Sequence, residues 1–332
     1  MRAHFAALAA LLSFTSPVFG INVQDSFANG TRYESDPVFY AAVLGYAPVF
    51  DGVAFVAHQS GSLCSGALIS RRSVLTGRHC TDGLVAQDWR VSFATGGQVV
   101  GYDVSSVASL SANPLEPDNY FNGTDLAVLT LATDVANIMP FEILANPTVG
   151  EPVTMLGWGL HGTGSTGASS IDGLRRMAKN EIDVIAAGYD GNSLLYADFD
   201  KEDGSENTTE TVLGFVSSET GTDLEGLISN GDSGGPLLYE REDRWVLGGI
   251  ATGVNAFDGL ANSDYGDLGI WTGFRSDAAR TLLSDAGASF YTTSTPPLPA
   301  PVFLPAPIFS LASALLGLGL LRHLSRRKQA PT

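Results

Sequence analysis

Short apolar runs alternate with turn-forming residues from Val38 to about Phe274. The runs are rich in Val, Ile, Leu, Phe and Tyr and are separated by Gly, Asn, Asp and Ser, as in "GVAFVAH", "RVSFAT", "DLAVLTL" and "WVLGGIATG". Runs of this length and spacing are typical of β-sandwiches and β-barrels, and long periodic helical patterns are absent from the sequence. The pattern therefore predicts an all-β protein.

One segment near the end of this region has a helical pattern instead. In "FRSDAARTLLSDAGA" the apolar residues fall on one helical face and follow Ser276 or Asp277, either of which can cap a helix. We expect a short closing helix over residues 276–287.

The segment from His161 to Leu227 is poor in strand pattern and rich in Gly, Ser, Thr, Asp and Glu. It predicts long surface loops between strands, and such loops are where binding specificity is often placed. Within it, "ADFDKEDGSEN" gathers acidic residues that could hold calcium but miss the EF-hand spacing, so a solvated acidic loop is favoured. These residues are Asp198, Asp200, Glu202 and Asp203.

The N-terminal segment has the pattern of an export signal. A basic start leads into the apolar run "FAALAALLSF" and then Pro17. We expect a signal peptide over residues 1–20 with cleavage after Gly20, and an N-terminal arm over residues 21–37. The alternative is a buried helix of the fold.

The C-terminal segment also differs from the body of the chain. A Pro-rich linker over residues 288–307 precedes an apolar and then basic tail over residues 308–328, which is short for a membrane span. With Pro297–Ala300 (PLPA), this tail resembles the PEP-CTERM or VPLPA-type sorting signals of bacterial exported proteins, and a plain tail anchor is the alternative. Both predict an exported protein of the periplasm, cell surface or exterior that is at least transiently anchored in the membrane; the resemblance implies a sorting or processing protease as partner.

Composition narrows the class of partner. The formal net charge is −17, with 35 acidic residues against 18 basic ones, and this balance repels nucleic acid.

Only two cysteines occur, Cys64 and Cys80. In an exported chain such a pair favours a disulfide over a zinc site, which needs about four ligands. No metal or cofactor is expected.

The stretch "SNGDSGGPLL" sets Ser233 among glycines. A serine nucleophile needs a base, a group that orients the base, and donors for the oxyanion. Flexible glycines let the N–H groups of Gly231 and Ser233 converge on one point. The same residues fit the elbow of the α/β-hydrolases, but that fold needs a histidine after the serine, and only His323 in the basic tail follows it.

A histidine and a carboxylate lie upstream of the serine. His79 follows a strand-like run and precedes Cys80, so a Cys64–Cys80 bridge would pin its loop, whereas His58 and His161 are expected to be structural. Asp125 in "NGTDLAVLTL" precedes an apolar strand, where it can be buried and still face the imidazole.

Together these motifs resemble the trypsin-like, chymotrypsin-fold serine peptidases. The resemblance spans residues 38–287 and includes "GWG", "GGIATG" and "GDLGIWTGF". It implies two six-stranded antiparallel β-barrels, over about 38–135 and 136–275, with the active site between them. Ser233 would attack the peptide carbonyl, and an acyl-enzyme would be hydrolysed by water. His79 would act as base and then acid, and Asp125 would orient it.

The resemblance also assigns a substrate pocket. Leu227 matches the residue at its base, where a leucine cannot pair with Lys or Arg, and Gly269 with Gly253 leaves its mouth open. Thr252, Gly253 and Val254 would pair with the substrate backbone. A medium or small apolar preference is expected.

Three departures from the family pattern stand out. Arg78 replaces a small residue beside His79, Ser229 replaces a pocket cysteine, and no Ile-Val-Gly-Gly terminus is present to pair with Asp232. Asp232 is then held by internal hydrogen bonds or by the arm that begins at Ile21. The leading hypothesis is an exported serine endopeptidase acting on proteins or peptides; an inactive surface binding protein and an esterase are the alternatives.

Overall fold

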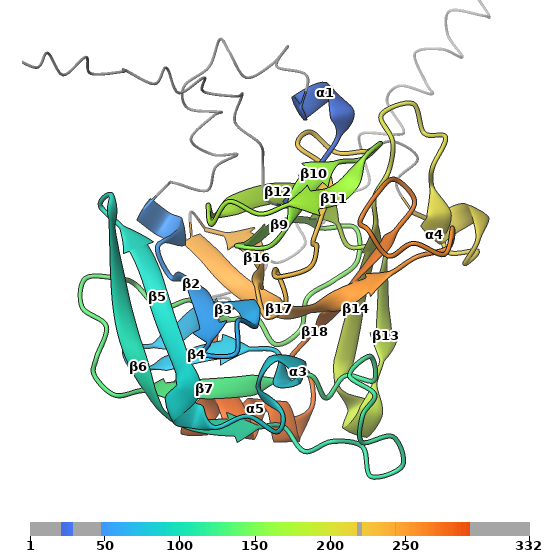
Figure 1. Ribbon diagram of the computed structural model, residues 1–332. Helices are drawn as coiled ribbons and strands as arrows, with labels where there is room; N and C mark the ends of the chain where they lie inside the picture. The colour runs from blue at the N-terminus through green and yellow to red at the C-terminus, as the bar shows by residue number, and fades with distance from the viewer. Residues whose placement is uncertain (1–20, 29–47, 218–220, 243, 293–332) are drawn as a thin grey trace, which may run out of the picture. The chain divides into compact units, whose positions relative to one another are not determined.

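A computed structural model of the protein describes residues 21–28, 48–217, 221–242 and 244–292 (Figure 1). The predicted signal peptide and sorting tail lie outside the described residues. Within these ranges, no helix is long and apolar enough to cross a membrane.

Six strands form a closed barrel in the order β2-β3-β4-β7-β6-β5, drawn in blue to green in Figure 1. Neighbouring strands are antiparallel, and bulges in β3 and β6 let them bend around the barrel. Apolar side chains fill the interior, and every residue of β4 is buried. The strands are β2 (Val53–His58), β3 (Leu63–Ser70), β4 (Ser73–Thr76), β5 (Trp89–Thr95), β6 (Gln98–Ser109) and β7 (Ala127–Leu131).

The second half is a larger sheet in the order β12-β9-β16-β17-β18-β14-β13, with β8 paired to β17. The mostly β fold and the closed six-stranded barrel are confirmed; this second sheet has eight strands where six were expected. Its strands are β8 (Glu142–Ile143), β9 (Pro152–Gly157), β12 (Arg176–Glu181), β13 (Val184–Ala187), β14 (Ser193–Asp198), β16 (Pro236–Arg241), β17 (Arg244–Asn255) and β18 (Leu268–Thr272).

A small third sheet brings the N-terminal arm into the fold, in the order β11-β10-β1-β15. Strand β1 (Ile21–Val23) runs parallel to β10 (His161–Thr163) and antiparallel to β15 (Gly226–Leu227), and β11 (Gly167–Ser170) pairs with β10. The segment between His161 and Leu227 contributes strands to two sheets, and the prediction of long loops between its strands is wrong except for the connection between β14 and β15.

The helices are short. Helix α5 (Asp277–Asp285) closes the domain as predicted, and the hydroxyl of Ser276 caps it by accepting a hydrogen bond from the Ala279 N–H at 3.1 Å. The other helices of the described residues are α1 (Asp25–Ala28), α3 (Arg78–Thr81), α4 (Thr208–Thr211) and the 3₁₀ turns η1 (Pro48–Phe50), η2 (Ala86–Asp88) and η3 (Tyr189–Gly191).

Candidate active site

His79 and Asp125 are brought together by strand pairing. His79 lies in α3, just after β4, and Asp125 lies just before β7, and these two strands pair with Thr76 opposite Ala127. The His79 N–H donates to Asp125 Oδ1 at 2.8 Å, and His79 Nδ1 lies 2.7 Å from Asp125 Oδ2. Asp125 is fully buried. The carboxylate therefore fixes both the backbone and the ring of His79.

This pairing sets the chemistry of the imidazole. A carboxylate accepts hydrogen bonds, so the proton of the neutral ring resides on Nδ1, and Nε2 keeps its lone pair. Nε2 of His79 is then available to accept a proton from a nucleophile.

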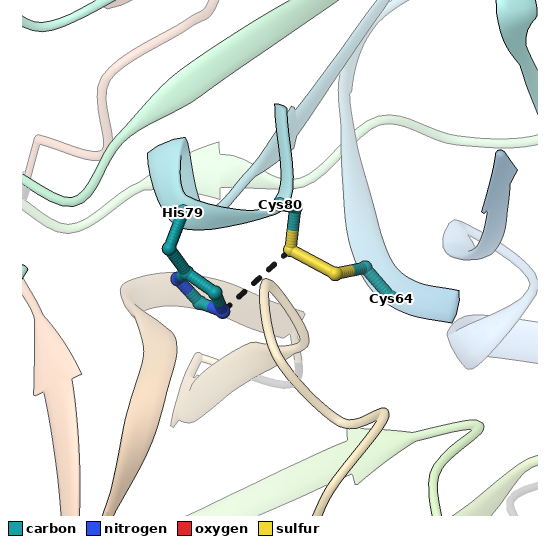
Figure 2. A group of neighbouring side chains, drawn as sticks. All are labelled: Cys64, His79 and Cys80. Carbon is teal, nitrogen blue, oxygen red and sulfur yellow. Dashed lines mark hydrogen bonds between the residues drawn. A yellow bond between two sulfur atoms is a disulfide. The ribbon is translucent and has the colours of Figure 1, made fainter. Parts of the chain in front are cut away.

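The Cys64–Cys80 disulfide lies against the same ring (Figure 2). Cys80 Sγ is 3.7 Å from His79 Nε2 and 3.9 Å from the carbonyl oxygen of Ser233. The bridge thus packs between the histidine loop and the serine loop. Because the two sulfur atoms are bonded to each other, His79 is the one member of this trio with a free metal-ligating atom.

The Arg78 side chain turns away from the site. Its guanidinium is buried, donates to Asp82 Oδ2 at 2.6 Å and to the carbonyl oxygen of Thr124 at 3.2 Å, and lies 4.6 Å from the ring centre of Tyr120. The Tyr120 ring in turn packs edge-on against His79, with centroids 5.7 Å apart. Arg78 therefore holds the loop that leads to Asp125 and leaves the imidazole unobstructed.

The other upstream histidines have structural surroundings. His58 packs against Trp89 with ring centroids 4.8 Å apart. His161 is buried. Its burial, and to a smaller extent the positive charge of the nearby Arg176, lower its pKa to about 3, so its ring stays neutral.

The loop that carries Ser233 packs tightly against the barrel. The Ser65 N–H donates to the carbonyl oxygen of Ser233 at 2.7 Å. Gly234 has φ +78°, and a Cβ there would lie 2.1 Å from Thr76 Oγ1 and 2.8 Å from the Gly77 nitrogen. Only glycine fits at position 234. The close packing of Gly234 against Thr76 and Gly77 places Ser233 beside the histidine loop. No hydrogen bond joins Ser233 Oγ to His79 Nε2 within the described part of the chain; such bonds are often long without substrate.

Two N–H groups in this loop have no acceptor. Neither the Gly231 N–H nor the Ser233 N–H donates a hydrogen bond within the described ranges. Gly231 has φ +94°, and a Cβ there would lie 2.8 Å from the Cα of Gly159. The backbone conformation that leaves these donors free therefore requires glycine at position 231.

Asp232 is fully buried between them. Its Oδ1 accepts from the Gly159 N–H at 2.8 Å, and its Oδ2 accepts from the Ser229 N–H at 2.8 Å. The Ser229 hydroxyl lies 3.0 Å from Asp232 Oδ2 and also donates to the carbonyl oxygen of Leu160, so these two acceptors share its one hydrogen. Burial raises the pKa of Asp232 to about 7 even though these hydrogen bonds favour the charged form. Ser229, which replaces the pocket cysteine of the resemblance, is thus a hydrogen-bond donor to Asp232.

The N-terminal arm lies next to these same partners. Ile21 is fully buried and stands opposite His161, while Asn22 stands opposite Leu227. The arm therefore lies between the strand that follows Gly159 and the strand that precedes Ser229. Gly159 and Ser229 are the two residues whose N–H groups donate to Asp232.

The floor of the predicted pocket is filled by apolar side chains. A Cβ on Gly269 would lie 2.8 Å from Leu227 Cδ1 and 2.5 Å from Trp271 Cη2. Both side chains are fully buried. Trp271 was missed in the sequence, although it stands two residues after Gly269 on one strand and so faces the same side.

Residues 252–254 form the end of β17. Gly253 and Val254 pair with β18, and Thr252 stands at a bulge in that pairing. Because β16 pairs with β17 only as far as Ile250, the other edge of residues 252–254 has no strand in the described part of the chain. The Thr252 hydroxyl lies 2.8 Å from Thr272 Oγ1. A Cβ on Gly253 would lie 3.0 Å from Cζ of the half-exposed Phe121.

The predicted solvated acidic loop is wrong for two of its members. Asp198 and Asp200 are buried; Asp198 Oδ2 accepts from the Thr209 N–H at 2.7 Å, and the Asp200 backbone N–H donates to Glu225 Oε1 at 2.7 Å. Asp203 stays at the surface. A different acidic group brings carboxylate oxygens within 4.8 Å of one another: Asp258, Asp264 and Asp267.

Comparison with known proteins agrees with this arrangement. The trypsin family model matches residues 47–275, more than half of the chain, and the protein belongs to this family of serine peptidases. The chain is 25% identical over 228 residues to CLIP domain-containing serine protease B15 of Anopheles gambiae, covering 60% of this chain and 56% of that protein. It is 26% identical over 217 residues to brachyurin of Leptuca pugilator, covering 61% of this chain and 79% of that protein. It thus spans little more than half the length of the first relative.

Proposed function

We propose that the protein is an exported serine endopeptidase that uses Ser233 as nucleophile, His79 as general base and acid, and Asp125 as the orienting carboxylate. The observation that carries this proposal is the two-point contact between His79 and the buried Asp125. Beside it lies a serine loop in which the Gly231 and Ser233 N–H groups have no acceptor among the described residues. A site of this kind is built for acyl transfer.

In the proposed reaction, Ser233 Oγ attacks the peptide carbonyl carbon and His79 Nε2 takes the hydroxyl proton. The N–H groups of Gly231 and Ser233 stabilise the oxyanion, which is the larger part of the rate gain in such sites. His79 then gives its proton to the leaving amine. Water, deprotonated by the same imidazole, hydrolyses the acyl-enzyme and restores Ser233.

For the substrate, we propose a small apolar side chain before the scissile bond. Leu227 and Trp271 occupy the space above Gly269, which supports a shallow pocket without charge. The free edge at residues 252–254 supports pairing with an extended peptide. A library of peptide amides that differ only at this residue tests the proposal; preference for Arg or for large aromatic residues would contradict it.

The arm supports Asp232 in this proposal, together with the hydrogen bonds from Gly159 and Ser229. Export and the membrane tether rest on the sequence of residues 1–20 and 308–328, and fractionation of cells that express the full chain tests them.

The experiment that tests the activity is labelling of the full chain with a fluorophosphonate, which reacts with an activated serine. We expect labelling of the wild type, none of Ser233→Ala, and none of His79→Ala. The matched control is His58→Ala, which removes a histidine from the same barrel and should leave labelling intact. Unlabelled, folded wild type would contradict the proposal and favour a binding protein on a peptidase fold.

A further inference from the structure

Ser65 contacts the serine loop at two points. It is fully buried in β3, directly after Cys64, and was not singled out in the sequence. Its N–H donates to the carbonyl oxygen of Ser233 at 2.7 Å, and its hydroxyl donates to the carbonyl oxygen of Gly231 at 3.0 Å. One residue therefore holds two carbonyl groups of the loop.

The direction of the hydroxyl proton is fixed by a third contact. The Trp158 N–H donates to Ser65 Oγ at 3.0 Å, which uses a lone pair of the oxygen and leaves its hydrogen for the Gly231 carbonyl. Within the described part of the chain, the Ser65 hydroxyl is the one hydrogen-bond donor to that carbonyl.

These contacts act on the peptide group that carries the Ser233 N–H. That group joins Asp232 to Ser233, and both neighbouring peptide groups have their carbonyls anchored on Ser65. Its own carbonyl, of Asp232, accepts from the Gly235 N–H at 2.7 Å, so the Ser233 N–H points the opposite way. Gly231 is the weak point, because a glycine lets the adjacent peptide group rotate at little cost.

We propose that Ser65 is a positioning residue, whose hydroxyl holds the Gly231 carbonyl so that the Gly231 and Ser233 N–H groups stay aimed at the oxyanion. This role rests on the proposed function. Loss of a whole oxyanion donor lowers kcat by about 10²–10³-fold. Loss of the anchor leaves the donors present but free to turn away, so we expect roughly a tenfold fall in kcat.

The test compares Ser65→Ala with Ser73→Ala in the full chain. Ser73 is the matched control, because its buried hydroxyl also donates to a backbone carbonyl, that of Ala286 at 2.8 Å, far along the sequence from the serine loop. The substrate is a peptide amide with alanine before the scissile bond, and the second readout is the affinity for the corresponding peptide boronic acid, which forms a tetrahedral adduct.

We expect Ser65→Ala to lower kcat and boronate affinity in parallel with KM unchanged, and Ser73→Ala to change neither. If Ser65→Ala is unfolded at the assay temperature, the wild type and both variants are compared at a lower temperature at which urea unfolding shows Ser65→Ala to be folded. A folded Ser65 variant with wild-type kcat, or one that changes only KM, would overturn the positioning role alone. An inactive wild type would overturn the proposed function, and this role with it.

Discussion

Replacement of Gly234 by alanine tests whether packing of the serine loop sets the position of Ser233. A Cβ at position 234 would lie 2.1 Å from Thr76 Oγ1 and 2.8 Å from the Gly77 nitrogen, against ordinary contacts of 3.4 Å or more. The loop must therefore move by about 1 Å, a displacement that costs about 100-fold in rate when it misplaces a reacting group. The positive φ adds about 1–2 kcal/mol of destabilisation, and overpacking adds about 1–3 kcal/mol.

Gly97→Ala is the control that separates the two effects. Gly97 has φ +75°, close to the +78° of Gly234, but a Cβ there meets nothing within 4 Å. Urea unfolding and the rate of fluorophosphonate labelling are measured for both variants at a temperature where both are folded. We expect Gly97→Ala to lose only about 1–2 kcal/mol and to label normally. Equal behaviour of the two variants would refute the reasoning.

Three further predictions concern the arm, the disulfide and buried acids. Ile21→Ala should lower the free energy of unfolding by about 2–5 kcal/mol and slow labelling; a stability loss without slower labelling would contradict the support of Asp232 by the arm. Replacing Cys64 and Cys80 by serine should cost about 3 kcal/mol in urea unfolding, because the bridge closes a loop with sequence separation 16; no change would contradict this. Burial raises the pKa of Asp200 and Glu225 in the folded protein to about 8, above the unfolded values. Their contribution to the free energy of unfolding is therefore fully present below about pH 4 and is lost as the pH rises through 8. Asp200→Asn should flatten the fall of the urea midpoint between pH 5 and 9, and an unchanged slope would contradict it.

The sequence predicts strands well where burial and hydrophobicity coincide. The run "DLAVLTL" contains β7, and "WVLGGIATG" lies within β17, because these strands are buried over most of their length. The pattern fails for β12, "RMAKNE", which is largely buried although it contains polar residues. Asn180 in this strand donates to the carbonyl oxygens of Asp198 and Gly226 at 2.7 and 3.2 Å. Such partners come from distant segments, so hydrophobic periodicity cannot reveal them.

The same limit applies to the candidate site, where the sequence gives the type of each residue but does not show which way its side chain points. The sequence brings out His79 and Asp125 because the chemistry demands both, and strand pairing places them together. It singles out Arg78 as a bulky cation beside the base but leaves the direction of its side chain open. The structure gives that direction: the guanidinium donates to Asp82 and lies over the Tyr120 ring, which packs against His79. A side chain next to a candidate catalytic residue in sequence can thus point into its support, because consecutive residues of a helix project about 100° apart.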